Sequence, residues 1–399
     1  MSSEVINFYD LLSTVIPTVI ELVILNLFKF ILRYVSLIIS SFIIYRIYKT
    51  YSDFLLPFSI SLKRKTEMKG MVEHFNPQNM IYTEKCPIPK ILKPTQLLIK
   101  IYSASINPID YKILFSRIIF IRWLYYPNYN IGYDISGIVL DVGEKVTKFK
   151  KGDLIYGFSV SGCLQEFTVA EENQIIKKPN NINFNEAASL PLVTLTAYQS
   201  LTWFYNKEDL KGKKLLVIGA SGGTGHIGVQ LGKYYQMEVY GVCSKKNTND
   251  VLNYGALKVY NYDNEDSMNE CLKEQFDLIF DTVSSNESID GDQFEKYGKL
   301  LNKNGKYVGI NGPIGKFFIG VIMSYFNYKS FEGGRHIHFY MKSRYKDFEE
   351  IKKIVEEGGV KPNINVREFN KDEVIKGFDE LKSRRTKGKI VFEIFKEPK

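Results

Sequence analysis

A short apolar run followed directly by a glycine-rich turn limits the folds open to this chain more than any other segment. The run, Lys213–Ala220, reads KKLLVIGA, and the turn continues as Gly219-Ala-Ser-Gly-Gly-Thr-Gly-His-Ile-Gly228. An uninterrupted apolar run of this length is typical of a parallel strand buried on both faces. Further candidate strands alternate with helical stretches beyond residue 228. This alternation predicts βαβ units in a doubly wound parallel sheet.

The spacing of three glycines in the turn predicts what the sheet binds. Gly223, Gly225 and Gly228 have the G-x-G-x-x-G spacing of a dinucleotide site. We expect the first to make the tight turn, the second to admit the pyrophosphate and the third to let helix and strand pack closely. The alternative is a flexible glycine loop, but a buried strand precedes this one and an amphipathic helix follows it. We therefore predict a dinucleotide at the helix N-terminus.

The end of the next predicted strand distinguishes between two dinucleotides. Sites for NAD usually place Asp or Glu there to accept hydrogen bonds from the ribose. This chain instead reads Val242-Cys-Ser-Lys-Lys-Asn247. A hydroxyl and two cations attract a 2′-phosphate, so we predict NADPH rather than NADH. A solvated basic turn is the alternative.

Changes in the pattern of residue types divide the chain into four parts. Residues 66–190 carry short strand-like runs punctuated by Gly and Pro, which predicts a β-rich domain. Residues 191–335 have the alternating α/β pattern, and residues 336–399 revert, with strands near His338–Met341 and Ile390–Phe395. One helix is predicted over Glu186–Trp203, where the first two parts meet.

The remaining part, residues 1–65, is hydrophobic and helical in pattern. Residues 11–28 read LLSTVIPTVIELVILNLF, which as a helix would be about 27 Å long, close to the thickness of a bilayer core. Basic residues follow this segment, so the positive-inside rule predicts one membrane anchor with the rest of the chain in the cytosol. We expect the endoplasmic reticulum or the mitochondrial outer membrane. The alternatives are a two-span hairpin that includes Tyr34–Tyr45, a buried helical hairpin, and the mitochondrial interior.

Charge and cysteine content exclude some classes of function. The net charge of +9 comes from 53 basic and 44 acidic residues that are interspersed, so we expect no nucleic-acid partner. Four Cys and four His without a Cys-x-x-Cys pair predict a reducing compartment and no bound metal.

The order of several motifs resembles a known superfamily. Ser105-Ile-Asn-Pro-Ile-Asp-Tyr-Lys112 is similar to S-x-N-P-x-D, and Gly132–Val139 is similar to G-x-D-x-x-G-x-V. With Arg385–Val391, they make residues 70–399 resemble the zinc-free quinone-oxidoreductase branch of the medium-chain dehydrogenases/reductases. The subgroup that looks most similar is that of reticulon-4-interacting protein 1. Zinc-dependent relatives have His and Glu at the positions of Tyr133 and Asp134, so a zinc ligand is missing here.

The resemblance implies a fold and a set of cofactor contacts. It implies a GroES-like catalytic domain, interrupted in sequence by a Rossmann domain, with NADPH between them. The implied pyrophosphate contacts lie in one turn: Ser221, Gly222, Gly223, Thr224 and Gly225. The implied contacts to the 2′-phosphate and adenosine, and the later cofactor positions, are Ser244, Lys246, Tyr262, His338, Tyr340, Arg385 and Lys387.

The expected reaction is hydride transfer from NADPH to a small lipophilic quinone or enone. Without zinc, neutral donors must polarise the acceptor, and we expect Asn107 and Tyr111 to do so, with Tyr133 a weaker candidate. A membrane anchor would suit a lipid-soluble quinone. The alternatives are a non-catalytic NADPH-binding scaffold that engages a partner at the membrane, and a cytosolic enoyl-thioester reductase. The resemblance also allows a homodimer.

Overall fold

The computed structural model describes most of the chain after residue 66. The described ranges are 67–73, 80–114, 131–159, 161–283, 293–310, 336–338 and 341–397. They belong to one compact unit, residues 65–399. The predicted membrane segments 11–28 and 34–45 lie outside these ranges. In these ranges we find no helix with both the length and the hydrophobicity of a membrane span.

A seven-stranded sheet forms the β-rich half. Its strands are β3 (Gln96–Ser105), β4 (Asp134–Val142), β5 (Leu154–Phe158), β6 (Phe167–Glu171), β7 (Ile175–Lys177), β14 (Ile364–Glu368) and β15 (Lys389–Glu393). The order is β14-β15-β3-β4-β5-β7, and β6 also pairs with β3. A hairpin of β1 (Glu67–Glu73) and β2 (Met80–Pro87) is bridged to this sheet's loops by Gly70 and Gln165. The last two strands therefore return to a sheet that the chain leaves after β7.

A six-stranded parallel sheet forms the other half. Its strands are β8 (Lys214–Ile218), β9 (Glu238–Cys243), β10 (Lys258–Asn261), β11 (Phe276–Asp281), β12 (Leu301–Gly309) and β13 (His336–His338). Their order, β10-β9-β8-β11-β12-β13, reverses direction beside β8, as in a doubly wound dinucleotide fold. The GroES-like and Rossmann-like halves expected from the sequence are thus both present. The strand that we placed in the returning segment, β13, pairs instead with β12 of the parallel sheet.

Helices surround the two sheets. The described α-helices are α2 (Pro108–Leu114), α4 (Phe184–Ala188), α5 (Pro191–Thr202), α6 (Gly225–Tyr234), α7 (Thr248–Tyr254), α8 (Glu265–Cys271), α10 (Gln293–Tyr297), α12 (Tyr345–Glu356) and α13 (Lys371–Lys382). Our prediction of one helix over Glu186–Trp203 was wrong, because Pro191 has no N–H to continue it and instead opens α5.

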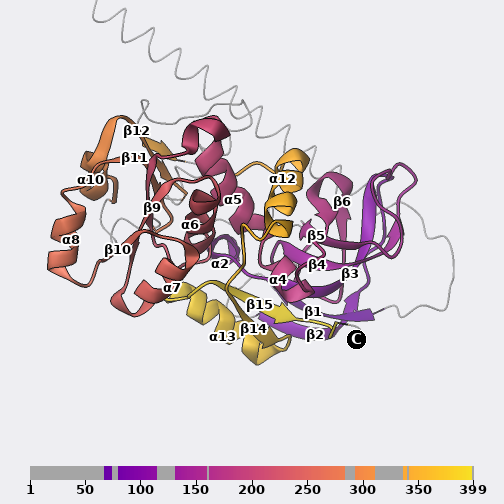
Figure 1. Ribbon diagram of the computed structural model, residues 1–399. Coiled ribbons are helices and arrows are strands. Elements are labelled where there is room, and N and C mark those ends of the chain that lie inside the picture. Colours follow the sequence, from indigo (N-terminus) through magenta and orange to yellow (C-terminus); the bar gives the residue numbers. More distant parts are fainter. Residues whose placement is uncertain are drawn as a thin grey trace, which may run out of the picture. The chain divides into compact units, whose positions relative to one another are not determined.

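The parallel sheet is buried on both faces. Leu215 and Val217 pack with α5, α6 and α12 in one apolar cluster, which also takes in Tyr156 and Phe158 of the other sheet. Leu216 and Ile218 pack on the opposite face with residues of α8 and α10. Figure 1 shows α8 and α10 on one side of this sheet and α5 and α6 on the other. Residues Leu215–Ile218 therefore alternate between two cores, which is why all four are apolar.

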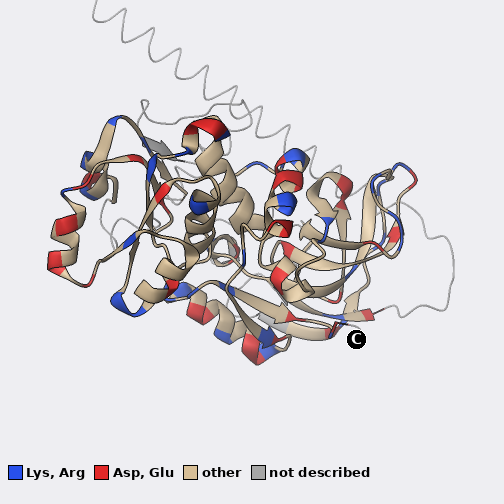
Figure 2. Cartoon of the chain, in the orientation of Figure 1, with Lys and Arg blue, Asp and Glu red and all other residues tan. Residues whose placement is uncertain are grey.

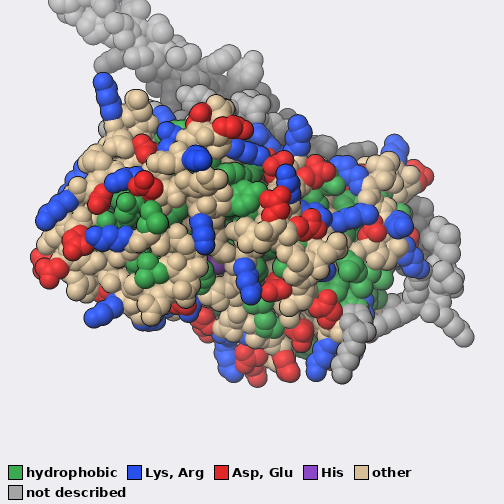
Figure 3. Space-filling model, in the orientation of Figure 1, with side chains coloured by type: hydrophobic (Ala, Val, Ile, Leu, Met, Phe, Trp, Pro, Cys, Tyr) green, Lys and Arg blue, Asp and Glu red, His purple; other side chains and the backbone are tan. Residues whose placement is uncertain are grey.

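Charges of both signs are spread over the described part. Figure 2 shows Lys and Arg among Asp and Glu on both halves. Figure 3 shows the same mixture on one face of the surface, with small apolar areas between the charges. On this face of the described part, no large area carries charges of one sign alone (Figure 3).

Candidate functional site

The turn between β8 and α6, and the packing of α6 on the sheet, depend on three glycines. Gly219 has a φ of +76°, and a Cβ there would lie 2.5 Å from Cγ2 of Val283. A Cβ at Gly225 would lie 2.1 Å from the Gly219 carbonyl oxygen, and one at Gly228 would lie 2.9 Å from the Phe280 ring. Our assignment of the tight turn to Gly223 was wrong, because Gly219 is the glycine of this turn with a positive φ. Gly228 has the expected role, since it lets α6 pack closely on β11.

This turn fits a dinucleotide pyrophosphate. Gly225 has no room for a Cβ because the Gly219 carbonyl lies against it, so the chain turns tightly from β8 into the first turn of α6. The first turn of α6 presents N–H groups that lack partners within the helix, and the positive end of the helix dipole lies there. Ser221, Gly222, Gly223, Thr224 and Gly225 all lie in this turn, at the carboxyl end of the central strand. That end is where doubly wound sheets bind their ligands.

The predicted 2′-phosphate residues lie at the end of β9. Ser244 is buried, whereas Lys246 is exposed on the short 3₁₀ turn Lys245–Asn247. Asn247 Nδ2 donates to Ser221 Oγ over 2.9 Å, which ties this turn to the glycine-rich one. The Lys245 N–H donates to both carboxylate oxygens of Asp263, at 3.1 and 3.2 Å. Sequence reasoning missed Asp263 because it follows β10 and not β9.

The later cofactor positions fall into two groups. Arg385 Nη1 donates to Tyr262 Oη over 3.1 Å, so these two predicted residues lie together. Lys387 Nζ lies 2.6 Å from Asp250 Oδ2 on α7, and this partner raises the pKa of Lys387. His338 belongs to the edge strand β13, and Tyr340 lies outside the described residues.

The segment that precedes β15 connects the glycine-rich turn to the β-rich half. The Gly388 N–H donates to the Ser221 carbonyl over 3.1 Å, and Gly388 forms a parallel bridge with Gly222. His226 makes a second connection from α6. Its Nδ1 lies 2.9 Å from the Gly222 carbonyl, and its Nε2 accepts from the N–H of Asn363, just before β14. Because that N–H can only donate, the proton of the neutral ring is on Nδ1.

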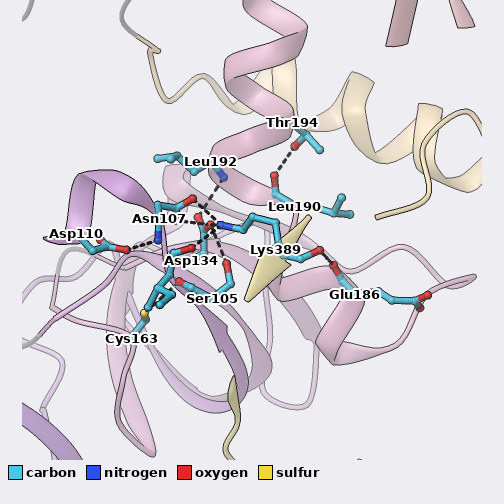
Figure 4. Close-up of polar contacts among 12 residues, drawn as sticks. Ser105, Asn107, Asp110, Asp134, Cys163, Glu186, Leu190, Leu192, Thr194 and Lys389 are labelled. Atoms are coloured by element: carbon cyan, nitrogen blue, oxygen red, sulfur yellow. Dashed lines mark hydrogen bonds and ion pairs between the residues drawn. The ribbon is translucent and has the colours of Figure 1, made fainter. Parts of the chain in front are cut away.

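A buried cluster lies directly beyond this connection (Figure 4). Lys389 Nζ is 2.5 Å from Asn107 Oδ1, 3.0 Å from the Ile106 carbonyl and 3.3 Å from Asp134 Oδ2. Asp134 Oδ2 also accepts from Asn107 Nδ2 and Ser105 Oγ, and its Oδ1 accepts from the N–H of Leu192 in α5. The Lys389 and Asp134 side chains are only 4% and 0% exposed, so this ion pair is shielded from water.

The three predicted catalytic residues lie in different environments in the structure. Asn107 is fully buried, and both ends of its amide are engaged in the cluster. The amide that we expected to polarise the acceptor joins Asp134 to Lys389, and its role toward an acceptor stays a prediction. Tyr111 is half-buried on α2 against the core of the β-rich half. Tyr133 is half-buried against the apolar cluster that spans the two halves.

Lys112, beside Tyr111 on α2, is a titratable residue that the sequence did not single out. Burial and the nearby Arg384 guanidinium lower the pKa of Lys112 to about 8. Arg384 Nη2 donates to the Val283 carbonyl at the end of β11, over 2.9 Å. Arg384 thus lies between Lys112 and the strand ends where the dinucleotide is expected.

The described residues do not fit a catalytic zinc ion. Among them, no group of three or more His, Cys, Asp or Glu is placed to hold a metal. Cys163 is buried with its Sγ 3.9 Å from the Ser105 carbonyl, and burial raises its pKa well above the usual value. A thiol of raised pKa is a poor metal ligand, because the thiolate is the form that binds.

Comparisons with known proteins agree with this architecture. A family described as alcohol dehydrogenase GroES-like domain matches residues 93–180, and one described as zinc-binding dehydrogenase matches residues 254–392. The chain is 30% identical over 313 residues to 2-methylene-furan-3-one reductase of Solanum lycopersicum, covering 75% of this chain and 72% of that protein. It is 29% identical over 346 residues to human NAD(P)H oxidoreductase RTN4IP1, mitochondrial, covering 78% and 85%.

A solved structure extends the likeness to the fold. The quinone oxidoreductase from Coxiella burnetii superposes with a TM-score of 0.68 at 26% identity, covering 82% of this chain and 99% of that one. With the two-sheet fold and the glycine-rich turn, these likenesses show that the chain belongs to the medium-chain dehydrogenase/reductase superfamily, as an NAD(P)H-dependent oxidoreductase of the quinone-oxidoreductase type.

Proposed function

We propose that this protein uses NADPH, without zinc, to reduce a quinone or an α,β-unsaturated carbonyl. The observation that carries the proposal is the tight turn at Gly219–Gly225, which brings the N-terminus of α6 to the carboxyl end of the central strand β8, where doubly wound sheets bind their ligands. The basic turn at Lys245 and Lys246 supports a phosphorylated adenosine. The relatives, a 2-methylene-furan-3-one reductase and an NAD(P)H oxidoreductase, support this reaction class.

The proposed roles of the residues follow from their places. NADPH supplies the hydride when bound, and the first turn of α6 holds its pyrophosphate. Ser244, Lys246, Tyr262, Arg385 and Lys387 are proposed around the adenosine and its 2′-phosphate. The cluster of Asn107, Asp134 and Lys389 holds the start of α2 at a fixed distance from the glycine-rich turn, because Gly388 bonds to Ser221.

Charge arriving on the acceptor oxygen must be met by a proton donor. Tyr111 and Lys112 are adjacent on α2, and a lysine with a pKa of about 8 is largely protonated at neutral pH. We propose that one of them supplies this proton, with Tyr133 as a weaker candidate. An acceptor polarised by hydrogen bonds alone must be conjugated, which favours quinones and enones over simple ketones.

The test is NADPH oxidation by the purified full chain with a panel of quinones and enones. We expect turnover that Gly223→Asp abolishes together with NADPH binding, measured by calorimetry, because the carboxylate would repel the pyrophosphate. Circular dichroism should show the fold retained, since a Cβ at Gly223 meets its nearest atoms only at 3.2 Å. Lys246→Glu is expected to weaken NADPH more than NADH, whereas the exposed Lys273→Glu, with the same charge change, leaves the ratio unaltered. Equal kcat/KM for the two cofactors would contradict the NADPH proposal.

The second candidate is a scaffold that binds NADPH and engages a partner without turnover. The intact turn is compatible with both functions, so it does not choose between them. Tight NADPH binding without turnover on any acceptor in the panel would favour the scaffold.

Membrane tethering through residues 11–28 remains part of the proposal. It rests on the sequence pattern alone, together with the lipophilic character of long-chain quinones. Carbonate extraction of cell membranes tests it: an anchored protein stays in the pellet, and release into the supernatant would contradict the anchor. Cell fractionation would also separate a cytosol-facing protein from one in the mitochondrial interior, and sedimentation would test the proposed homodimer.

A further inference from the structure

Two carboxylates lie beside the cations proposed for the 2′-phosphate. Asp263 accepts from the Lys245 N–H, and Asp250 lies 2.6 Å from Lys387 Nζ. Both carboxylates raise the pKa of Cys243, the last residue of β9, beyond the larger effect of burial. Their fields therefore reach the strand end where the 2′-phosphate is expected.

The two carboxylates differ in what they hold. Asp263 binds a backbone N–H and leaves the Lys245 side chain exposed to solvent. Asp250 binds the side-chain cation of Lys387 itself. Lys387 is adjacent to Gly388, which bonds to Ser221 of the glycine-rich turn, and Asp250 lies on the helix that directly follows the Lys245–Asn247 turn. The Asp250–Lys387 pair thus lies between the two elements that would hold the phosphates.

We infer that Asp250 sets the preference between NADPH and NADH by competing with the 2′-phosphate for Lys387. This inference rests on the proposed function, because it requires a dinucleotide in this site. For Lys387 to contact a 2′-phosphate, its ammonium must leave Asp250 or divide its N–H donors between the two anions, and in both cases the carboxylate repels the phosphate. The ribose 2′-hydroxyl of NADH neither competes for Lys387 nor is repelled by Asp250. The loss of binding free energy therefore affects NADPH alone. Asp250 therefore lowers the discrimination that the basic turn would otherwise give.

The test compares two nucleotides that differ only in the 2′-phosphate. Adenosine 2′,5′-bisphosphate and adenosine 5′-monophosphate are titrated into the full chain by calorimetry. We expect Asp250→Asn to tighten the bisphosphate roughly two- to fivefold, the range for an exposed charge pair, and to leave the monophosphate unchanged. With Lys387→Gln also present, the gain is expected to shrink, because only the relief of repulsion remains.

The matched control is Asp372→Asn, an exposed carboxylate in the first turn of α13. It makes the same change in net charge and is expected to alter neither affinity. An equal change for both nucleotides in Asp250→Asn, or no change for either, would overturn the inference while leaving the proposed function standing. If neither nucleotide binds the unaltered chain, the proposed dinucleotide site fails together with the inference.

Discussion

His226 shows how one buried side chain couples the glycine-rich turn to the strands of the other half. It is fully buried, and both ring nitrogens are engaged by backbone groups of Gly222 and Asn363. Burial lowers its pKa from 6.5 to about 4, since water that would stabilise the charged ring is excluded. The ring is therefore neutral wherever the protein is folded near neutral pH.

We predict that this histidine makes the protein less stable in acid. The unfolded chain binds a proton at His226 below about pH 6.5, whereas the folded chain does so only near pH 4. Stability is therefore fully present above pH 6.5 and falls between 6.5 and 4, by roughly 3 kcal/mol for this shift. Urea unfolding across that range should show a shallower fall for His226→Gln than for the unaltered chain. Parallel curves would contradict the assignment.

The buried pair of Lys389 and Asp134 gives a second prediction at this scale. Lys389→Met should lower the free energy of unfolding by about 3–5 kcal/mol, because it leaves a buried carboxylate without its cation. Adding Asp134→Asn should recover part of the loss, since the uncompensated charge is then gone. The control is Lys376→Met, which removes an exposed partner of Glu373 and should cost less than about 1 kcal/mol. Strictly additive losses in the double variant would argue against a coupled pair.

At the scale of elements, α4 and α5 show where a local pattern misleads. Apolar and small residues run through Glu186–Trp203, so periodicity indicates one helix. The break at Pro191 has a consequence that cannot be predicted from periodicity. It leaves the first N–H groups of α5 without partners in the helix, and the N–H of Leu192 donates to Asp134. The N-terminus of α5 is thus held by the buried carboxylate of Asp134.

The packing of α6 on β11 gives the prediction for this scale. Gly228→Ala would place a Cβ 2.9 Å from the Phe280 ring, which must shift or push the helix away from the sheet. We expect a loss of about 1–3 kcal/mol, typical of overpacking in a core. The control is Gly309→Ala at the end of β12, where, among the described residues, the added Cβ would meet Tyr307 alone, at 3.7 Å. Equal melting temperatures for the two variants would contradict the close contact.

At the scale of the whole described unit, residues 384–389 join parts that are far apart in sequence. Arg384 reaches Val283 just after β11, Arg385 reaches Tyr262 just after β10, Gly388 reaches the glycine-rich turn, and Lys389 reaches the cluster at Asn107. The segment therefore contacts the proposed adenosine edge, the pyrophosphate turn and the β-rich half within six residues. Binding at the first two would restrain the third.

At the scale of the whole molecule we predict that removing metal ions has no effect. Because the described residues offer no three-ligand group, we expect exhaustive dialysis against a chelator to leave turnover and the unfolding midpoint unchanged. Elemental analysis of the purified full chain should find zinc well below one atom per chain. Activity that is lost on chelation and restored by zinc would contradict the zinc-free proposal.

The sequence by itself determined the two-domain architecture, the parallel sheet and the position of the dinucleotide turn. These features follow from local patterns: an apolar run for a strand buried on both faces, glycines where a Cβ cannot fit, and alternation for βαβ units. Tertiary structure alone decided that Asn107 turns inward to Lys389, 282 residues away, and that Asp250 and Asp263 lie beside the basic turn. Local periodicity reports which face of an element is buried. It does not report which distant charge packs against that face, because that depends on how the elements come together.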